Sequence, residues 1–172
     1  MLPPLKAYFH GSFANFERFD DRYATSVGHH FGDWGQAVHR IGGRNGFIYE
    51  VKLRYRSPLE VTRDLGWEHP GWTVKGLLQL ELFKFQELVE LQDTVDKDIS
   101  IYLERVDSLE IFRRNSLVID YLESKGFDSI LYPNEFETPD GSPRRAICVF
   151  HSHQIDIVKK HVWSPDTSKR LS

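Results

Sequence analysis

Apolar and polar residues alternate along several stretches of the chain, and a period of two is typical of strands with one buried face. The clearest strand is expected over residues 46–55, where every odd position from 47 onward is aromatic or aliphatic. Pro58 ends it, and residues 59–61 form a short edge strand. The chain closes on two further strands, residues 129–137 and 146–151, joined by a Pro-Asp-Gly-Ser-Pro turn typical of hairpins.

Two shorter strands are expected near the N-terminus, and both end at glycines. Residues 6–9 form the first, which Gly11-Ser12 halts, and residues 29–31 form the second, with a glycine on either side. Between them, phenylalanines at every third position of residues 13–19 have near-helical spacing. This segment ends in the polar residues 20–22 and is expected to turn the chain between the two strands.

Apolar residues three or four positions apart predict helices in the rest of the chain. Asp33 caps the first helix, which a Gly-Gly pair ends. Residues 74–89 are ambiguous because their centre alternates like a strand, but their length and their Leu, Glu, Gln and Lys content favour one helix. Asn115 or Ser116 caps a later helix, which ends at Gly126.

The order of these elements describes a mixed α+β domain: strand, turn, strand, helix, long strand, helices and terminal hairpin. With 172 residues, 40% hydrophobic and 27% charged, the chain has the length and composition of one globular domain. We assign this domain to residues 1–163 and expect residues 164–172 to form a loose tail.

Composition argues against several classes of function. No stretch approaches the ~20 apolar residues of a membrane span, and the N-terminus lacks the apolar run of a secretion signal. The lone Cys148 cannot form an intramolecular disulfide, so the expected location is the cytoplasm, of the producing cell or of a target cell. A net charge of −3 argues against wholesale capture of nucleic acid. Four arginines are interpreted as a solvated face rather than a nucleic-acid patch: Arg54, Arg56, Arg144 and Arg145.

Metal and thiol chemistry are both disfavoured. His151 and His153 would share one strand face, but the sequence has no Cys-x-x-Cys pair and no His-Glu-x-x-His motif, so no metal is expected. Cys148 lies in Ala-Ile-Cys-Val-Phe, which is typical of a buried, inert thiol. There is no Gly-x-Ser-x-Gly motif, and the glycine-rich residues 42–46 join a helix to a strand, which favours a turn over a phosphate-binding loop.

Four short segments occur in an informative order. They are Tyr-Phe-His-Gly-Ser at 8–12, Gly-His-His-Phe-Gly at 28–32, Ile-Tyr-Glu-Val-Lys-Leu at 48–53 and Gly-Phe-Asp-Ser-Ile-Leu-Tyr-x-Asn-x-x-Glu at 126–137. Together they resemble the ADP-ribosyltransferase superfamily, in its diphtheria-toxin and poly(ADP-ribose) polymerase-like branch and its bacterial and phage-borne members. The resemblance spans residues 8–157 apart from the middle helices. It implies an α+β fold with a split mixed β-sheet and flanking helices, and NAD as co-substrate without a metal.

The resemblance implies that the first two segments bind NAD. His10 would hydrogen-bond the ribose that carries nicotinamide, and Gly11, followed by Ser12, would let the backbone approach the carboxamide because it lacks a Cβ. His30 occupies the position at which a tyrosine often stacks on nicotinamide. Phe31 belongs to the same binding motif, although strand alternation directs its side chain into the core.

Loss of nicotinamide builds positive charge on the ribose, which a carboxylate stabilises. In the polymerase-like branch this glutamate comes from a late strand, at a position that corresponds here to the neighbourhood of Ala146. The bacterial pattern Asn-x-x-Glu instead assigns the catalytic role to Glu137 and places Asn134 in the site. Glu135, on the same face of the expected strand, is the second candidate. Arg40 would bind the NAD pyrophosphate, or else is a surface arginine.

The resemblance therefore implies an enzyme that transfers ADP-ribose from NAD to a macromolecular acceptor, protein or nucleic acid. Such a protein would act as a toxin, effector or phage-defence component, and an antitoxin or immunity protein is a candidate partner. Two alternatives are an NAD glycohydrolase, with water as acceptor, and a non-catalytic module that binds NAD or ADP-ribose. Acceptor choice is expected to depend on the loops at residues 66–72 and 138–143.

Overall fold

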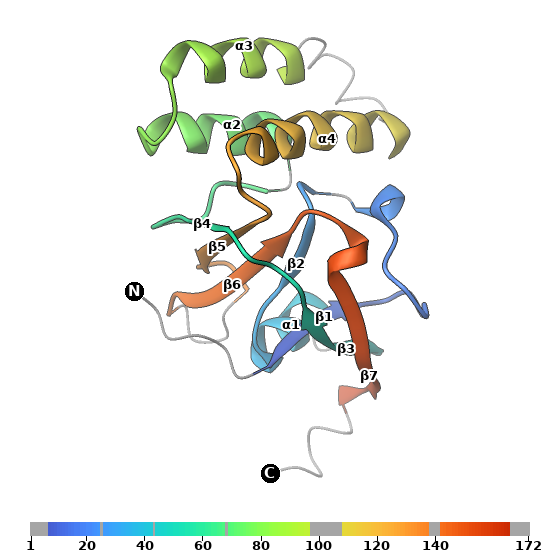
Figure 1. Cartoon of the computed structure of the whole chain (residues 1–172). Helices are drawn as coiled ribbons and strands as arrows, with labels where there is room; N and C mark the ends of the chain where they lie inside the picture. Colours follow the sequence, from blue (N-terminus) through green and yellow to red (C-terminus); the bar gives the residue numbers. More distant parts are fainter. Residues whose placement is uncertain are drawn as a thin grey trace.

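The computed structural model describes residues 7–24, 26–42, 44–67, 69–96, 108–137 and 142–165. Within these residues the protein is a mixed α+β structure with two β-sheets and four α-helices (Figure 1). Three of the helices lie together at one end of the molecule, and the fourth packs against a strand at some distance from them. No helix in this described part combines the length and the apolar character needed to cross a bilayer.

The two sheets pack on a shared core and are also linked by a backbone bridge. The first has the antiparallel order β1-β3-β7, formed by β1 (Tyr8–Ser12), β3 (Gly46–Leu53) and β7 (Ile155–Trp163). The second has the order β2-β6-β5-β4, formed by β2 (His29–Phe31), β6 (Arg144–Val149), β5 (Ser129–Asn134) and β4 (Pro58–Glu60). Only β4 and β5 pair in parallel. Reciprocal backbone hydrogen bonds between Phe9 and Gly32, 2.9 and 3.0 Å long, connect β1 to the end of β2.

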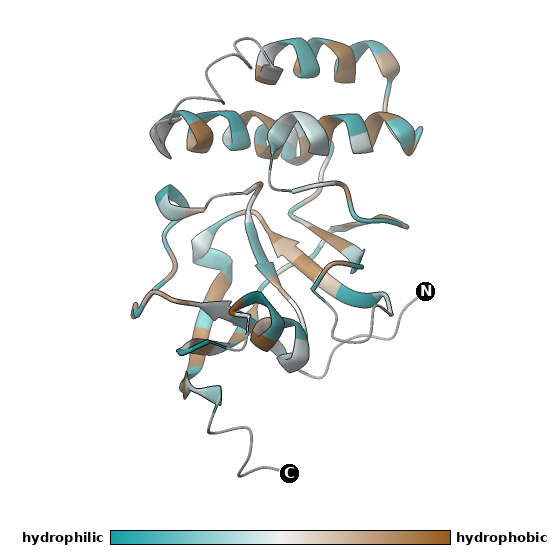
Figure 2. Cartoon of the chain, turned by 180° about the vertical axis from the view of Figure 1, so that it is seen from behind, coloured by the Kyte–Doolittle hydropathy of each residue, from teal (hydrophilic) through white to brown (hydrophobic). Residues whose placement is uncertain are grey.

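The helices divide between the two sheets. α2 (Pro70–Gln79), α3 (Phe85–Asp96) and α4 (Ser108–Ser124) share one core with the second sheet. This core includes Val74, Leu77, Leu88, Val118, Leu122, Ile130 and Phe150. Figure 2 shows hydrophobic and hydrophilic residues alternating along these helices, as expected for helices that bury one face. α1 (Trp34–Arg40) instead packs Ala37 and Ile41 against the first sheet.

Several predicted boundaries are confirmed because local rules determine them. The Asp33 side chain accepts a hydrogen bond from the N–H of Gln36 at 2.9 Å, and the Gln36 side chain accepts one from the N–H of Asp33 at 2.7 Å. Gly42 and Gly126 follow α1 and α4 with φ of 56° and 89°, the left-handed conformation that glycine adopts readily. The long strand β3 also begins at residue 46 as predicted, but it ends at Leu53 rather than at 55, and β4 lies one residue earlier than predicted.

The N-terminal segment differs from the prediction in two ways. β1 continues through Gly11-Ser12 instead of stopping there, while residue 6, its expected start, lies outside the described residues. The near-helical spacing after it produces no helix, because Phe16 and Phe19 pack together against Tyr49 of β3 instead of lining one face of a helix. Phe16 stacks on Tyr49 at 4.1 Å between ring centroids, and Phe19 meets Phe16 edge-on at 4.9 Å.

The prediction of one helix over residues 74–89 is correct in type and wrong in extent. The chain breaks at residues 80–84, where Glu81 has a φ of 55°, and α3 folds back onto α2. Folding back buries the apolar stripes of both helices in the core with the sheet, which a single straight helix would not do. The predicted cap at Asn115 or Ser116 is wrong as well, because α4 begins at Ser108 and Asn115 lies buried inside it.

The C-terminal part contains a strand that the sequence did not predict. β7 pairs with β3 along its length, and a bulge in β3 between Glu50 and Val51 shifts the register. Three consecutive polar residues, Lys-Lys-His, interrupt the alternation in β7 and conceal it. β5 ends at Asn134 rather than at 137. Residues 138–141 of the expected hairpin turn and 166–172 of the expected tail lie outside the described residues.

Candidate active site

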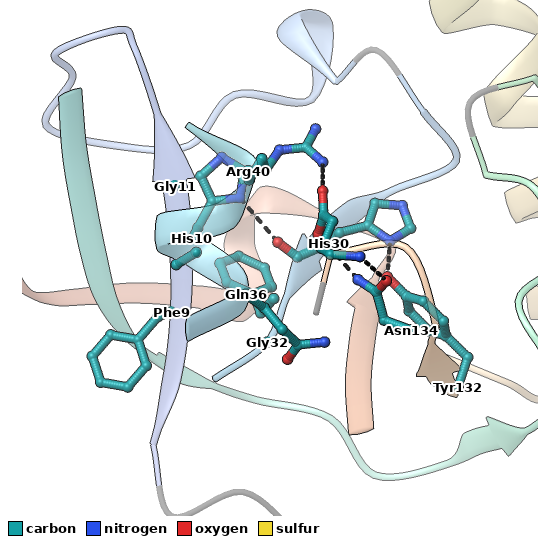
Figure 3. Close-up of a pocket in the computed structure, with 12 residues that line it drawn as sticks. Phe9, His10, Gly11, His30, Gly32, Gln36, Arg40, Tyr132 and Asn134 are labelled. Atoms are coloured by element: carbon teal, nitrogen blue, oxygen red, sulfur yellow. Dashed lines mark hydrogen bonds and ion pairs between the residues drawn. The ribbon is translucent and has the colours of Figure 1, made fainter. Parts of the chain in front are cut away.

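The candidate site lies where β1, β2 and the turn after β5 converge. A cleft of about 1100 Å³ runs from His10 and Gly11 along residues 13–24, and Arg40 and Glu137 border it. A second, small space of about 10 Å³ adjoins it and shares these side chains (Figure 3). His10, His30 and Glu137 are therefore brought together, although they are far apart in the sequence.

His10 is held in one neutral form. Its Nδ1–H donates to the backbone carbonyl oxygen of His30 at 2.9 Å, since a carbonyl can only accept (Figure 3). Burial lowers the pKa of His10 to about 4, and the positive charge of Arg40 acts in the same direction. At neutral pH the ring therefore carries its proton on Nδ1 and presents Nε2, which has no partner among the described residues, as an acceptor.

Gly11 and Ser12 line the cleft, but the structure gives them local functions as well. A Cβ on Gly11 would lie 2.0 Å from the carbonyl oxygen of Ala37 in α1, so the glycine is required by helix packing whatever binds in the cleft. The Ser12 hydroxyl accepts a hydrogen bond from the N–H of Ala14 at 3.1 Å and so shapes the turn after β1.

His30 is fixed at both ring nitrogens. Its Nε2–H donates to the carbonyl oxygen of Val27 at 3.0 Å, and its Nδ1 accepts from the Tyr132 hydroxyl at 2.9 Å. Burial, followed by the positive charge of Arg40, lowers the pKa of His30 to about 3. Phe31 points to the opposite face, where it is 2% exposed in the core and its ring lies 5.7 Å from that of His10.

The geometry after β5 explains the Asn-x-x-Glu spacing. The Asn134 side-chain oxygen accepts from the N–H groups of Phe136 and Glu137, at 3.1 and 3.0 Å. Its amide nitrogen donates to Oε2 of Glu137 at 3.0 Å. Nη1 of Arg40 donates to Oε1 of the same carboxylate at 2.6 Å. Asn134 thus folds the turn and orients Glu137, while Arg40 neutralises it.

Glu135 is placed elsewhere. β5 ends at Asn134, so strand alternation no longer puts Glu135 and Glu137 on one face, and that part of the prediction is wrong. Glu135 is exposed and lines a separate cavity of about 440 Å³ together with Glu60 and Arg145. It does not reach the cleft that contains His10.

Sequence reasoning missed two residues of the site. Tyr132 is 4% exposed on β5 and supplies the hydroxyl to His30. Its position two residues before Asn134, on the same strand face, was the signal that could have identified it. Gln36 lines the small space, and its buried Nε2 finds no partner among the described residues.

Other candidate chemistry lies outside the cleft. Cys148 is buried and its thiol donates to the carbonyl oxygen of Val27 at 2.9 Å; burial raises its pKa far above the usual range. His151 and His153 stack at 5.3 Å between ring centroids, and no group of three or more metal-ligating side chains gathers in the described ranges. Three of the four arginines considered above pair with carboxylates: Arg54 with Asp156, Arg144 with Asp33 and Arg145 with Glu60.

Three groups of the protein define the kind of ligand that the cleft can bind. His10 accepts from a hydroxyl, His30 offers an uncharged flat ring, and the carboxylate of Glu137 stabilises positive charge that develops near it. Aromatic residues of the 13–24 segment give the rest of the cleft a largely apolar wall. No protein-family model, curated protein or solved structure matches the chain.

Proposed function

We propose that the protein is an NAD-dependent ADP-ribosyltransferase whose two joined sheets are the split mixed β-sheet of that superfamily. The observation that carries this proposal is the convergence of His10, His30 and Glu137 around one cleft. The sequence resemblance assigned these three residues to NAD from separate segments, without reference to their positions in space. The ordering of Glu137 by Asn134 adds support, because both belong to the Asn-x-x-Glu pattern.

The chemistry follows from the positions of these groups. The bond between the anomeric carbon of ribose and nicotinamide breaks, and its electron pair remains on the ring nitrogen, which becomes neutral. Glu137 stabilises the positive charge left on the sugar, and His10 accepts a hydrogen bond from a ribose hydroxyl through Nε2. The acceptor then forms a bond to the anomeric carbon and releases its proton. Arg40 exchanges Glu137 for the pyrophosphate of NAD, a stronger anionic partner.

A labelled-NAD assay tests the proposal. The purified protein is incubated with NAD labelled in its ADP-ribose part and a cell lysate, beside Glu137→Gln and the matched control Glu135→Gln. We expect label on a protease- or nuclease-sensitive acceptor, a loss of about 100-fold or more in Glu137→Gln, and near-normal transfer in Glu135→Gln.

Other outcomes have defined meanings. Free ADP-ribose without a labelled acceptor identifies an NAD glycohydrolase, and NAD that binds without being cleaved identifies a binding module. Absence of NAD binding by calorimetry overturns the proposal. Equal loss of activity in the two glutamate variants refutes the assignment of Glu137.

A further inference from the structure

Tyr132 lies behind the cleft rather than in it. It comes from β5, is 4% exposed, and its hydroxyl meets Nδ1 of His30 at 2.9 Å (Figure 3). Tyr132 lines the small space but not the large cleft, whereas His30 borders both. A ligand in the large cleft is therefore expected to meet His30, with Tyr132 behind it.

The direction of each hydrogen bond can be assigned. The carbonyl oxygen of Val27 only accepts, so Nε2 of His30 carries the hydrogen and Nδ1 carries the lone pair. The Tyr132 hydroxyl must then be the donor in its bond to Nδ1. Burial raises the pKa of Tyr132 well above its usual value, which keeps this donor protonated. Both ring nitrogens of His30 are thereby occupied, and neither is free to take up a proton.

Packing and charge around His30 reinforce this state. Trp67 contacts both rings, with centroids 5.5 Å from His30 and 4.9 Å from Tyr132. The titratable groups next to His30 are Tyr132 and, across the strand pair, Cys148, while Arg40, His29 and His10 lower its pKa electrostatically. The positive charge of Arg40 and the hydrogen bond that Nδ1 accepts from Tyr132 oppose a second proton, and together with burial they outweigh the bond to the Val27 carbonyl, which favours one.

We infer that Tyr132 is a positioning residue, which holds the imidazole of His30 in one orientation and one neutral tautomer against the ligand. The inference rests on the proposed function, in which that ligand is NAD. The nicotinamide ring of NAD is cationic, so a protonated His30 would repel it, while a neutral ring held flat can stack on it. Tyr132 thus lets a histidine perform the stacking role that a tyrosine often has in the superfamily.

The test is a double-mutant cycle on NAD binding and cleavage. Tyr132→Phe removes only the hydroxyl, and we expect KM for NAD to rise by about tenfold, with a smaller change in kcat. In a His30→Phe background the same change should have no further effect, because Tyr132 acts through His30. Tyr121→Phe is the matched control: its hydroxyl bonds Glu87 on a distant helix, and kinetics should be unchanged.

A spectroscopic measurement separates positioning from general stability. In ¹⁵N NMR of the histidine rings, wild-type His30 should show one neutral tautomer with the proton on Nε2, and Tyr132→Phe should show exchange between forms. An equal loss in both backgrounds of the cycle, or an unchanged His30 spectrum in Tyr132→Phe, overturns the inference. The NMR measurement needs no NAD, so it still determines the tautomer of His30 if NAD proves not to be the substrate. Failure of NAD to bind the wild-type protein counts against the proposed function alone.

Discussion

Asn134 is expected to control stability and activity together, because its side chain makes three hydrogen bonds in the turn that carries Glu137. In Asn134→Ala the N–H groups of Phe136 and Glu137 lose their acceptor, and Oε2 of Glu137 loses a donor. Each such bond contributes about 1 kcal/mol, and water replaces part of the loss at this surface turn. We therefore expect the free energy of unfolding to fall by about 2–3 kcal/mol, which lowers Tm by about 4–12 °C in a domain of this size.

A second variant separates the turn from the carboxylate. Asn134→Asp keeps an oxygen that can accept from both N–H groups, but places a second carboxylate where the amide donated to Glu137. Most of the lost stability should return. Two carboxylates this close repel each other when both are ionised, so the acid limb of the kcat/KM profile for NAD cleavage should move to higher pH.

Thermal unfolding and pH–rate profiles of the three proteins measure these effects. Asn134→Ala should lower kcat toward the level of Glu137→Gln without falling below it, because it disorders the carboxylate without removing it. A normal Tm and a normal rate in Asn134→Ala would show that the turn forms without this side chain. Superimposable pH profiles for wild type and Asn134→Asp would refute the proposed contact with Glu137.

Two further predictions concern charge in the cleft. Arg40→Ala should raise KM for NAD by about 10-fold or more, the effect of a lost charge-assisted hydrogen bond. The control Arg44→Ala, which removes a guanidinium stacked on Phe13, should leave KM unchanged. Equal effects of the two substitutions would exclude a specific interaction of Arg40 with pyrophosphate. The pKa of His10 is lowered from 6.5 to about 4 in the folded protein. Its contribution to the free energy of unfolding is therefore fully present above about pH 6.5 and is lost progressively as pH falls toward 4, because the unfolded chain takes up the proton first. Urea midpoints at pH 7.5 and 4.5 should therefore differ more for wild type than for His10→Gln, and an equal difference would contradict the assigned shift.

The elements that the sequence predicted well are those that local rules determine. Asp33 caps α1 through hydrogen bonds to a residue three positions away, and the odd-numbered apolar residues of β3 alternate because they pack into one core. The segment after β1 could not be predicted in this way. Its rings are spaced as in a helix, yet Phe16 packs on Tyr49, a partner from β3. β7 was missed because Lys-Lys-His interrupts its alternation, and its pairing with β3 joins residues about a hundred positions apart.

The candidate site was predictable to a similar degree. The resemblance gave His10, His30 and Glu137, and the structure places them around one cleft. Strand alternation put Glu135 beside Glu137 only because β5 was extended past Asn134, where the side chain ends the strand by capturing two backbone N–H groups. Tyr132 was not predicted because a tyrosine in an apolar strand is usually assigned to the core; its position on the same strand face as Asn134 was the available signal, and the contact with His30 shows its place in the site.

The charges of the site suggest how ligand binding and catalysis are linked. In the free protein both imidazoles are neutral at physiological pH, and Arg40 neutralises Glu137 at 2.6 Å. An ionised Glu137 is most useful beside a sugar that develops positive charge, and least useful while it is paired with a guanidinium. Under the proposed function, the pyrophosphate of NAD competes for Arg40 as it enters the cleft and releases the carboxylate only when the substrate is in place. A ligand without a pyrophosphate, such as nicotinamide mononucleotide, would leave the ion pair intact and should therefore be cleaved far more slowly than its loss of binding contacts alone would explain.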